Sequence, residues 1–130
     1  MDIVIDTSAL LAVVIAEPER ERIVGATAGH SLIGPGSIPW EVGNAFSAML
    51  RQRRVTFDEA RKGLAIFETI PMRYVDVDLG HALAIAKKMN VYAYDAYFLE
   101  CAVRYTSPVL TVDKGLQHAA TKLGLRLLEV

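Results

Sequence analysis

Four acidic side chains stand at positions from which they could act together on a phosphate group. Asp6 and Asp113 each end a run of β-branched residues that predicts a buried strand. Glu41 and Asp95 each sit in the first turn of a predicted helix. In a parallel sheet covered by helices, the carboxyl ends of the strands and the amino ends of the following helices lie on one rim. We therefore expect the four carboxylates to converge there, although they span positions 6 to 113.

The chemistry of such a cluster follows from its charge. Carboxylates packed together without counter-charges repel, and each raises the pKa of the others. A divalent cation removes this penalty, and an incomplete shell of oxygen ligands suits Mg²⁺ or Mn²⁺. When such a cation is bound, its water becomes a nucleophile near neutral pH and its charge offsets that of a reacting phosphate. The set predicts hydrolysis of a phosphodiester, with metal-binding and catalytic roles for Asp6, Glu41, Asp95 and Asp113.

Each acid also has a purely structural interpretation. Asp6 could form a local turn through its own side chain, and Asp95 or Asp113 could only cap a helix. Glu41 could be a surface charge that the helix dipole favours. No single acid decides between these interpretations. The ordered set, with each acid at an edge of the predicted sheet, favours a functional site.

The elements that must position these acids alternate between strand and helix. The patterns predict strands over Ile3–Ile5, Ser31–Gly34, Arg73–Val77, Val109–Val112 and Leu125–Glu129. They predict helices over about Ala9–Ile15, Glu19–Ala28, Ala96–Tyr105 and Gly115–Leu123. Ser37 can cap a further helix that ends in residues 51–54. Thr56 and Glu59 form a capping box that opens a helix to about Ile70, and Asp78 caps a helix that includes Met89. Thr7 or Ser8 is expected to cap the first helix, and the residues from Tyr92 to Asp95 to form a connector. This alternation indicates an α/β fold with a parallel, helix-covered sheet in a single domain over residues 1–130.

Bulk properties exclude several classes of protein. The net charge of -1 argues against sequence-independent wrapping of nucleic acid, which requires many neutralised phosphates. Cys101 is the only cysteine and cannot form an internal disulfide. With no signal peptide ahead of the first strand, the chain is expected to be cytoplasmic. Its apolar runs are much shorter than the roughly 20 residues that span a membrane, so no membrane partner is expected.

The residues around the acids carry the resemblance to a known family. The opening Ile5-Asp6-Thr7-Ser8 resembles the first motif of PIN-domain ribonucleases, and among them of the VapC-type toxins of type II toxin–antitoxin systems. Trp40-Glu41-Val42-Gly43-Asn44 is similar to the second motif. Tyr94-Asp95-Ala96-Tyr97 resembles the third, and Leu110-Thr111-Val112-Asp113 the fourth. The match runs from end to end, and no motif is missing.

This resemblance implies a three-layer α/β/α PIN-like domain with a central parallel β-sheet. It also implies an Mg²⁺-dependent endoribonuclease, with Mn²⁺ as the other candidate metal, that cuts single-stranded regions of structured RNA. The implied partners are a cognate VapB-type antitoxin, whose C-terminal segment lies in the active-site groove, and a second copy of the chain in a homodimer.

The resemblance also implies a role for each site residue. Asp6 and Asp95 would hold Mg²⁺ most directly. Glu41 and Asp113 would complete the site, directly or through water. The hydrogen-bonding side chains that would orient ligands or substrate are Thr7, Ser8, Asn44 and Thr111.

Other polar and aromatic residues have open interpretations. A basic strip could contact the RNA backbone, face solvent or contact the antitoxin; its members are Arg51, Arg53, Arg54, Arg61 and Lys62. Lys114, next to Asp113, could touch a phosphate. The tyrosines at 92, 94 and 97 could stack on bases or pack in a core or dimer interface. The three histidines have no metal-ligand spacing and are expected at the surface.

Three rival functions make different demands on the sequence. A phosphoacceptor receiver domain needs an acid pair near the first strand and an Asp that ends a middle strand. Asp2 and Asp6 do not form the pair, and Asp58 lies at the start of a predicted helix. A phosphatase with an Asp-x-Asp nucleophile fails because residue 8 is Ser. The third rival is a PIN fold that only binds RNA or antitoxin, and four intact acids argue against it.

Overall fold

The computed structural model describes residues 1–130 and contains four strands and seven helices. The strands are β1 (Asp2–Ile5), β2 (Ser31–Pro35), β3 (Met72–Val75) and β4 (Val109–Leu110). The helices are α1 (Thr7–Val14), α2 (Arg20–Thr27), α3 (Ile38–Arg51), α4 (Phe57–Thr69), α5 (Leu79–Met89), α6 (Ala93–Tyr105) and α7 (Lys114–Lys122).

The strands form one parallel sheet in the order β3-β2-β1-β4. The inner strand β1 is buried on both faces: Ile3 and Val4 are fully buried and Ile5 is 1% exposed. A strand enclosed in this way must be apolar throughout, which explains its unbroken run of β-branched residues. The sequence-based prediction of a parallel, helix-covered sheet is confirmed.

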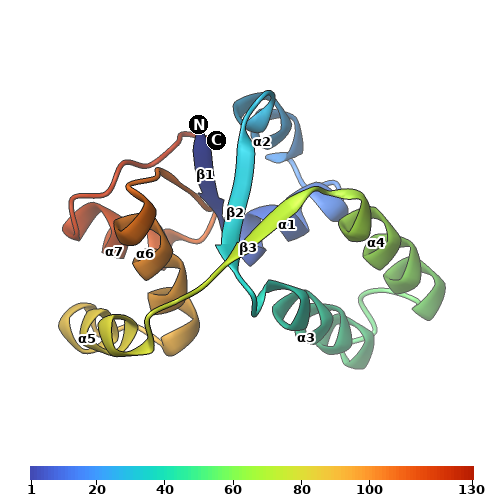
Figure 1. The fold of residues 1–130 in the computed structure, drawn as a ribbon. Helices are drawn as coiled ribbons and strands as arrows, with labels where there is room; N and C mark the ends of the chain where they lie inside the picture. Colours follow the sequence, from blue (N-terminus) through green and yellow to red (C-terminus); the bar gives the residue numbers. More distant parts are fainter.

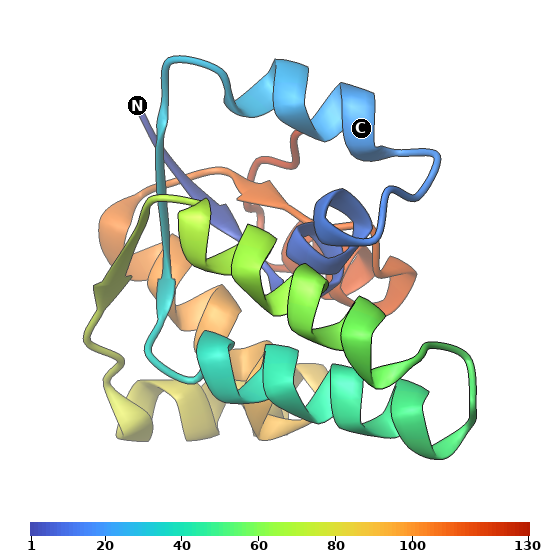
Figure 2. The same cartoon turned by 90° about the vertical axis from the view of Figure 1, so that its right-hand side faces the viewer.

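Helices cover both faces of this sheet. In Figure 1 the sheet is seen near its edge, with α1 to α4 on the right and α5 to α7 on the left. The view in Figure 2, from the right-hand side, has α3 and α4 in front of the strands and α5 and α6 behind them. On one face α1 contacts α2, α3 and α4, and on the other α6 contacts both β1 and β2. The predicted three-layer α/β/α architecture is therefore confirmed.

One hydrophobic core of 24 buried residues joins the three layers. Cys101 lies in it with no exposed surface, and burial together with the charge of Glu100 raises the pKa of its thiol to about 12. A thiol with so high a pKa is unreactive near neutral pH. None of the seven helices is both long and apolar enough to cross a lipid bilayer.

Four local predictions differ from the structure. Asp6, rather than Thr7 or Ser8, caps α1, because its carboxylate reaches the Ala9 amide at 3.0 Å. The predicted connector from Tyr92 to Asp95 is largely helix, since α6 already begins at Ala93. In this part of the chain no Gly or Pro interrupts the helical ladder, and the Ala96 amide donates to the Tyr92 carbonyl at 3.1 Å.

The other two differences concern the last strands. β4 has only two residues, and the predicted strand over Leu125–Glu129 is reduced to a single parallel bridge between Val109 and Leu127. Val109 makes both backbone bonds of this bridge, to the Arg126 carbonyl and the Leu128 amide, each at 2.9 Å. A strand of two residues cannot support a longer ladder, so the C-terminal segment leaves the sheet after one contact.

Candidate active site

The strand order switches direction beside β1, at the carboxyl edge of the sheet. After β1 the chain moves to β2 on one side, and it later returns through β4 to the other side of β1. The strands run downward in Figure 1, and the amino ends of α3 and α6 lie at the same lower end. In open parallel sheets, ligands bind outside the carboxyl ends of strands at such a switch in strand order.

Asp6 follows β1 directly at this edge of the sheet and is only 5% exposed. Its Oδ1 accepts hydrogen bonds from the Ala9 amide at 3.0 Å and the Ser8 hydroxyl at 2.8 Å. Its Oδ2 accepts from the Thr111 hydroxyl at 2.7 Å. Burial nevertheless outweighs these donors and, with the nearby charge of Asp113, raises the pKa of Asp6 from 3.8 to about 6. No cationic side chain contacts this carboxylate.

Asp95 and Asp113 approach the same place from α6 and from the start of α7. Asp95 is half-buried, and burial followed by the charge of Asp113 raises the pKa of its carboxyl. Asp113 caps α7 by accepting from the Gly115 amide at 3.0 Å. Since the charge of Asp113 raises the pKa of both Asp6 and Asp95, Asp113 lies within electrostatic reach of each of these two carboxylates.

Glu41 is connected to the strand edge by a hydroxyl. It occupies the first turn of α3, as predicted, and its Oε1 accepts from the Thr7 hydroxyl at 3.1 Å. Thr7 follows Asp6 directly, so this hydrogen bond connects the end of β1, where Asp6 lies, to Glu41 on α3. The structure therefore brings all four acids to the carboxyl edge of the sheet, through contacts that span most of the chain.

Comparison with known proteins places this architecture in a family. Residues 3–122 match the family model of the PIN domain. The chain belongs to the PIN domain family. A comparison with curated proteins gave no match.

Two solved structures resemble this PIN domain. The crystal structure of PAE2754 from Pyrobaculum aerophilum has a TM-score of 0.72 at 21% identity, covering 92% of this chain and 79% of that chain. VapBC2 from Rickettsia felis, crystallised with a DNA fragment from its promoter, has a TM-score of 0.69 at 12% identity, covering 98% of each chain. At these identities the likeness shows the fold alone.

The hydroxyl groups of this PIN domain form a chain around Asp6. The Ser8 and Thr111 hydroxyls lie 3.2 Å apart, and both contact the Asp6 carboxylate. The Thr111 hydroxyl also accepts from the Asp113 amide at 3.0 Å, and the Gln117 side chain donates to the Thr111 carbonyl at 2.9 Å. These contacts fix Asp6 against the end of β4.

Ser37 contacts one of the four acids, although its position in the sequence predicted only a helix cap. As the residue before α3 it makes no capping bond, and its hydroxyl donates to Glu41 Oε2 at 2.6 Å. Its position four residues before Glu41, one helical turn away, was the available signal. Together Ser37 and Thr7 occupy both oxygens of this carboxylate.

Other residues singled out in the sequence lie away from the acids or have no contact with them. Asn44 is exposed on α3 and makes no hydrogen bond to any of the four acids. Arg51, from the basic strip, is at the opposite end of α3 from Glu41, and Lys62 pairs with Asp58 at 3.0 Å. The three histidines are exposed, as predicted.

The donor set can be tested against a divalent cation. As the side chains stand, no group of three or more acidic, histidine or cysteine residues forms a ready metal cage. The chemistry of the four acids nevertheless fits a hard cation, since all are carboxylates and burial raises the pKa of two of them. Asp95 accepts no hydrogen bond from the protein, so both of its oxygens remain available. Mg²⁺ keeps several of its waters, which can connect it to acids that it does not touch directly.

Proposed function

We propose that this PIN domain is an Mg²⁺- or Mn²⁺-dependent endoribonuclease and the toxin of a VapBC-type toxin–antitoxin system. One observation carries the proposal: Asp6, buried without a cationic partner, shares the carboxyl edge of the sheet with Asp113. A protein gains no stability from such an arrangement, because burial and like charge both disfavour ionised carboxylates. A bound cation compensates the charge of these carboxylates and so accounts for their burial together.

Each acid has a role in this proposal. Asp6 and Asp95 hold the cation most directly, and Glu41 and Asp113 complete the site, directly or through water. The chemistry that the metal supplies when bound is a water activated for attack and an offset for the charge of the phosphate. Asp6 is oriented by the hydroxyls of Ser8 and Thr111.

Glu41 is oriented from two sides, by Thr7 and by Ser37. These hydroxyls donate to both carboxylate oxygens and so fix the direction in which Glu41 faces a cation. Asn44 is exposed on α3, where it can contact substrate, and it makes no hydrogen bond to the acids.

The proposed partners are RNA, a VapB-type antitoxin and a second copy of the chain, all met in the cytoplasm. VapBC2 from Rickettsia felis is a related fold crystallised on promoter DNA, which supports an antitoxin partner in general. An exposed apolar side chain on α5 supports a homodimer, since Leu83 is 68% exposed.

Cleavage of RNA by the purified chain tests the proposal. We expect a defined RNA cut in Mg²⁺ that EDTA abolishes, and a loss of at least about a hundredfold in rate for Asp95→Asn, since that side chain is a direct ligand. Expression without the neighbouring antitoxin gene is expected to arrest growth, and co-expression to relieve the arrest. Glu68→Gln, an exposed acid on α4, is the matched control. Cleavage that persists unchanged in Asp95→Asn, or RNA binding without any cleavage, would favour the binding module instead.

A further inference from the structure

A cavity of about 370 Å³ opens beside the candidate active site. Its wall comes from the β2–α3 connection at 35–37, from residues 74–77 at the end of β3, and from Leu79 and Tyr97. We name it the Tyr74–Tyr97 cavity. Small-molecule sites commonly have volumes of roughly 300–1,000 Å³, so it can receive one flat ring system. Neither metal binding nor the packing of the core accounts for it.

The cavity is directly connected to the acids. Ser37 lines it, and the same hydroxyl donates to Glu41 Oε2 at 2.6 Å. Tyr97 lines it as well and follows Asp95 by two residues on α6. The Ser37–Glu41 hydrogen bond therefore places the cavity next to one of the four acids.

Two tyrosines provide aromatic surface in the wall. Tyr74 is 44% exposed on the edge strand β3. Tyr97 is held edge-to-face by Tyr94, with ring centroids 5.9 Å apart and an interplanar angle of 84°. Aromatic side chains that are fixed and partly exposed are the surfaces on which unpaired RNA bases stack.

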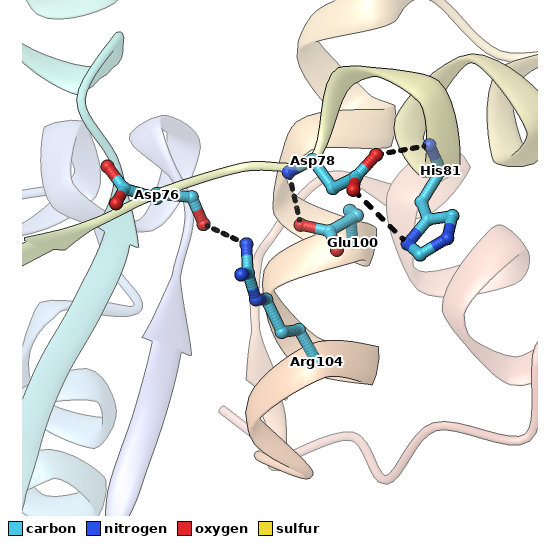
Figure 3. Close-up of polar contacts among 5 residues, drawn as sticks. All are labelled: Asp76, Asp78, His81, Glu100 and Arg104. Atoms are coloured by element: carbon cyan, nitrogen blue, oxygen red, sulfur yellow. Dashed lines mark hydrogen bonds and ion pairs between the residues drawn. The ribbon is translucent and has the colours of Figure 1, made fainter.

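Asp76 is the only charged residue in the wall. Its backbone is fixed from α6, because Arg104 Nη1 donates to the Asp76 carbonyl at 3.3 Å and the Asp78 amide donates to the buried Glu100 carboxylate at 3.3 Å. Figure 3 shows the Asp76 carboxylate on the other side of the chain, pointing away from Arg104. No hydrogen bond or ion pair from the protein engages this carboxylate.

The charge of the wall selects among the parts of a nucleotide. A phosphate is repelled by a cavity whose single charged group is a carboxylate, whereas a neutral base is not. Among the bases, guanine presents two neighbouring donors, N1–H and N2–H, which match the two oxygens of a carboxylate. Adenine and cytosine have an acceptor at the corresponding ring nitrogen, and uracil has one N–H between two carbonyls.

We propose that the Tyr74–Tyr97 cavity binds a guanine base of single-stranded RNA next to the phosphate that is cut, with Asp76 accepting from guanine N1–H and N2–H. The tyrosine rings contact the faces of the base. This inference rests on the proposed ribonuclease function for its place in catalysis, and guanine binding itself can be measured without cleavage.

The first test uses nucleosides, which lack phosphate. Guanosine, inosine, adenosine and uridine are titrated into the ¹⁵N-labelled full chain, and amide shifts are followed at Gly36, Ser37 and Asp76. Guanosine is expected to shift these amides at the lowest concentration. Inosine, which lacks the 2-amino group, is expected to bind several-fold more weakly, and adenosine and uridine weakest. Equal binding of the four nucleosides, or no shift at these amides, would overturn the proposal. The same amide shifts produced only by raising the protein concentration would also overturn it, because they would assign this face to a second copy of the chain.

Two variants locate the site. Asp76→Asn replaces one acceptor oxygen by a donor, and we expect about a tenfold loss of guanosine binding with little change for adenosine. Gly36→Leu fills the cavity, because a Cβ at Gly36 would meet no atom within 4 Å, and it should abolish binding of every nucleoside. Both variants should retain the parent melting temperature within a few degrees. Guanosine binding that survives in both would exclude this cavity.

The second test uses cleavage, with single-stranded RNAs that differ only in one guanine beside the cut. We expect the parent to prefer guanine there by about tenfold in kcat/KM, and Asp76→Asn to lose the preference while its Mn²⁺ affinity stays unchanged. Glu68→Gln, an exposed acid on α4, should keep the preference. Cleavage without base preference would overturn this inference alone. Guanosine binding without any cleavage would overturn the proposed ribonuclease function and leave the cavity assignment intact.

Discussion

The Asp6 carboxylate carries most of the electrostatic cost of the site. Its pKa is raised from 3.8 to about 6 in the folded chain, so the folded protein holds a proton that the unfolded chain has already lost between these values. Without metal, the free energy of unfolding should therefore fall as pH rises from about 4 to 6, by up to roughly 3 kcal/mol, and level off above that range.

Asp6→Asn tests this expectation. Denaturation of parent and variant in EDTA, at several values between pH 4.5 and 7.5, should show the variant gaining stability relative to the parent as pH rises. Addition of Mg²⁺ at pH 7.5 should stabilise the parent and not the variant. A difference between parent and variant that stays constant with pH would mean that the Asp6 carboxylate is not held at a raised pKa.

Ser37 makes a second prediction at the residue scale. Because its hydroxyl bonds Glu41 and no backbone amide, Ser37→Ala should leave the helix intact but release one oxygen of the Glu41 carboxylate. We expect Mn²⁺ affinity by calorimetry to fall about tenfold, with a nearly unchanged melting temperature. Ser47→Ala, at an exposed position on the same helix, is the matched control. Equal Mn²⁺ affinity in both variants would remove Ser37 from the site.

At this scale, the positions of the acids could be predicted from the sequence and their partners only in part. The acids follow apolar strands or open helices, and those patterns are local. The bond from Thr111 to Asp6 joins residues 105 positions apart, and no local pattern specifies which hydroxyl donates to which oxygen. Asn44 was expected to orient ligands from its motif, and it makes no bond to the acids in the structure.

The helices of one layer meet at a glycine. A Cβ at Gly63 on α4 would lie 2.5 Å from the ring of Phe46 on α3 and 3.3 Å from a methyl group of Val14 on α1. Gly63→Ala should therefore destabilise the protein by about 1–3 kcal/mol, although alanine favours a helix by about 1 kcal/mol.

Gly25→Ala on α2 is the matched control for the loss of stability expected in Gly63→Ala. A Cβ there would meet no atom within 4 Å, so the variant should be about as stable as the parent or up to about 1 kcal/mol more stable by urea denaturation. If both substitutions stabilised the chain equally, Gly63 on α4 would not be packed closely against Phe46 on α3.

The elements themselves were predictable where their signals are local. The capping box of Thr56 and Glu59 marks the start of α4, and Asp78 caps α5, both as predicted. The predicted strand over Leu125–Glu129 was wrong because the residues of a short segment do not specify how long the neighbouring strand is. β4 is too short to pair with more than Leu127, and that property belongs to the assembled sheet.

At the scale of the whole molecule, the strand order connects the site to the fold. β1 lies between β2 and β4, so the strand order switches beside it, and the four acids either follow these strands or begin the neighbouring helices at the carboxyl edge. The sequence predicted alternating strands and helices, and hence a parallel sheet, without specifying this order. We propose that this edge of the sheet gathers Asp6, Glu41, Asp95 and Asp113 around one cation site.

A crystal grown with Mn²⁺ tests this claim most directly, because the anomalous signal of the metal locates it without reference to activity. We expect an anomalous peak at the carboxyl edge of the sheet, with oxygens of Asp6 and Asp95 at about 2.1 Å and waters completing the shell. Asp6→Asn crystals grown in the same way should lose the peak. A peak elsewhere on the molecule, or an equal peak in Asp6→Asn, would mean that these carboxylates do not share a cation site.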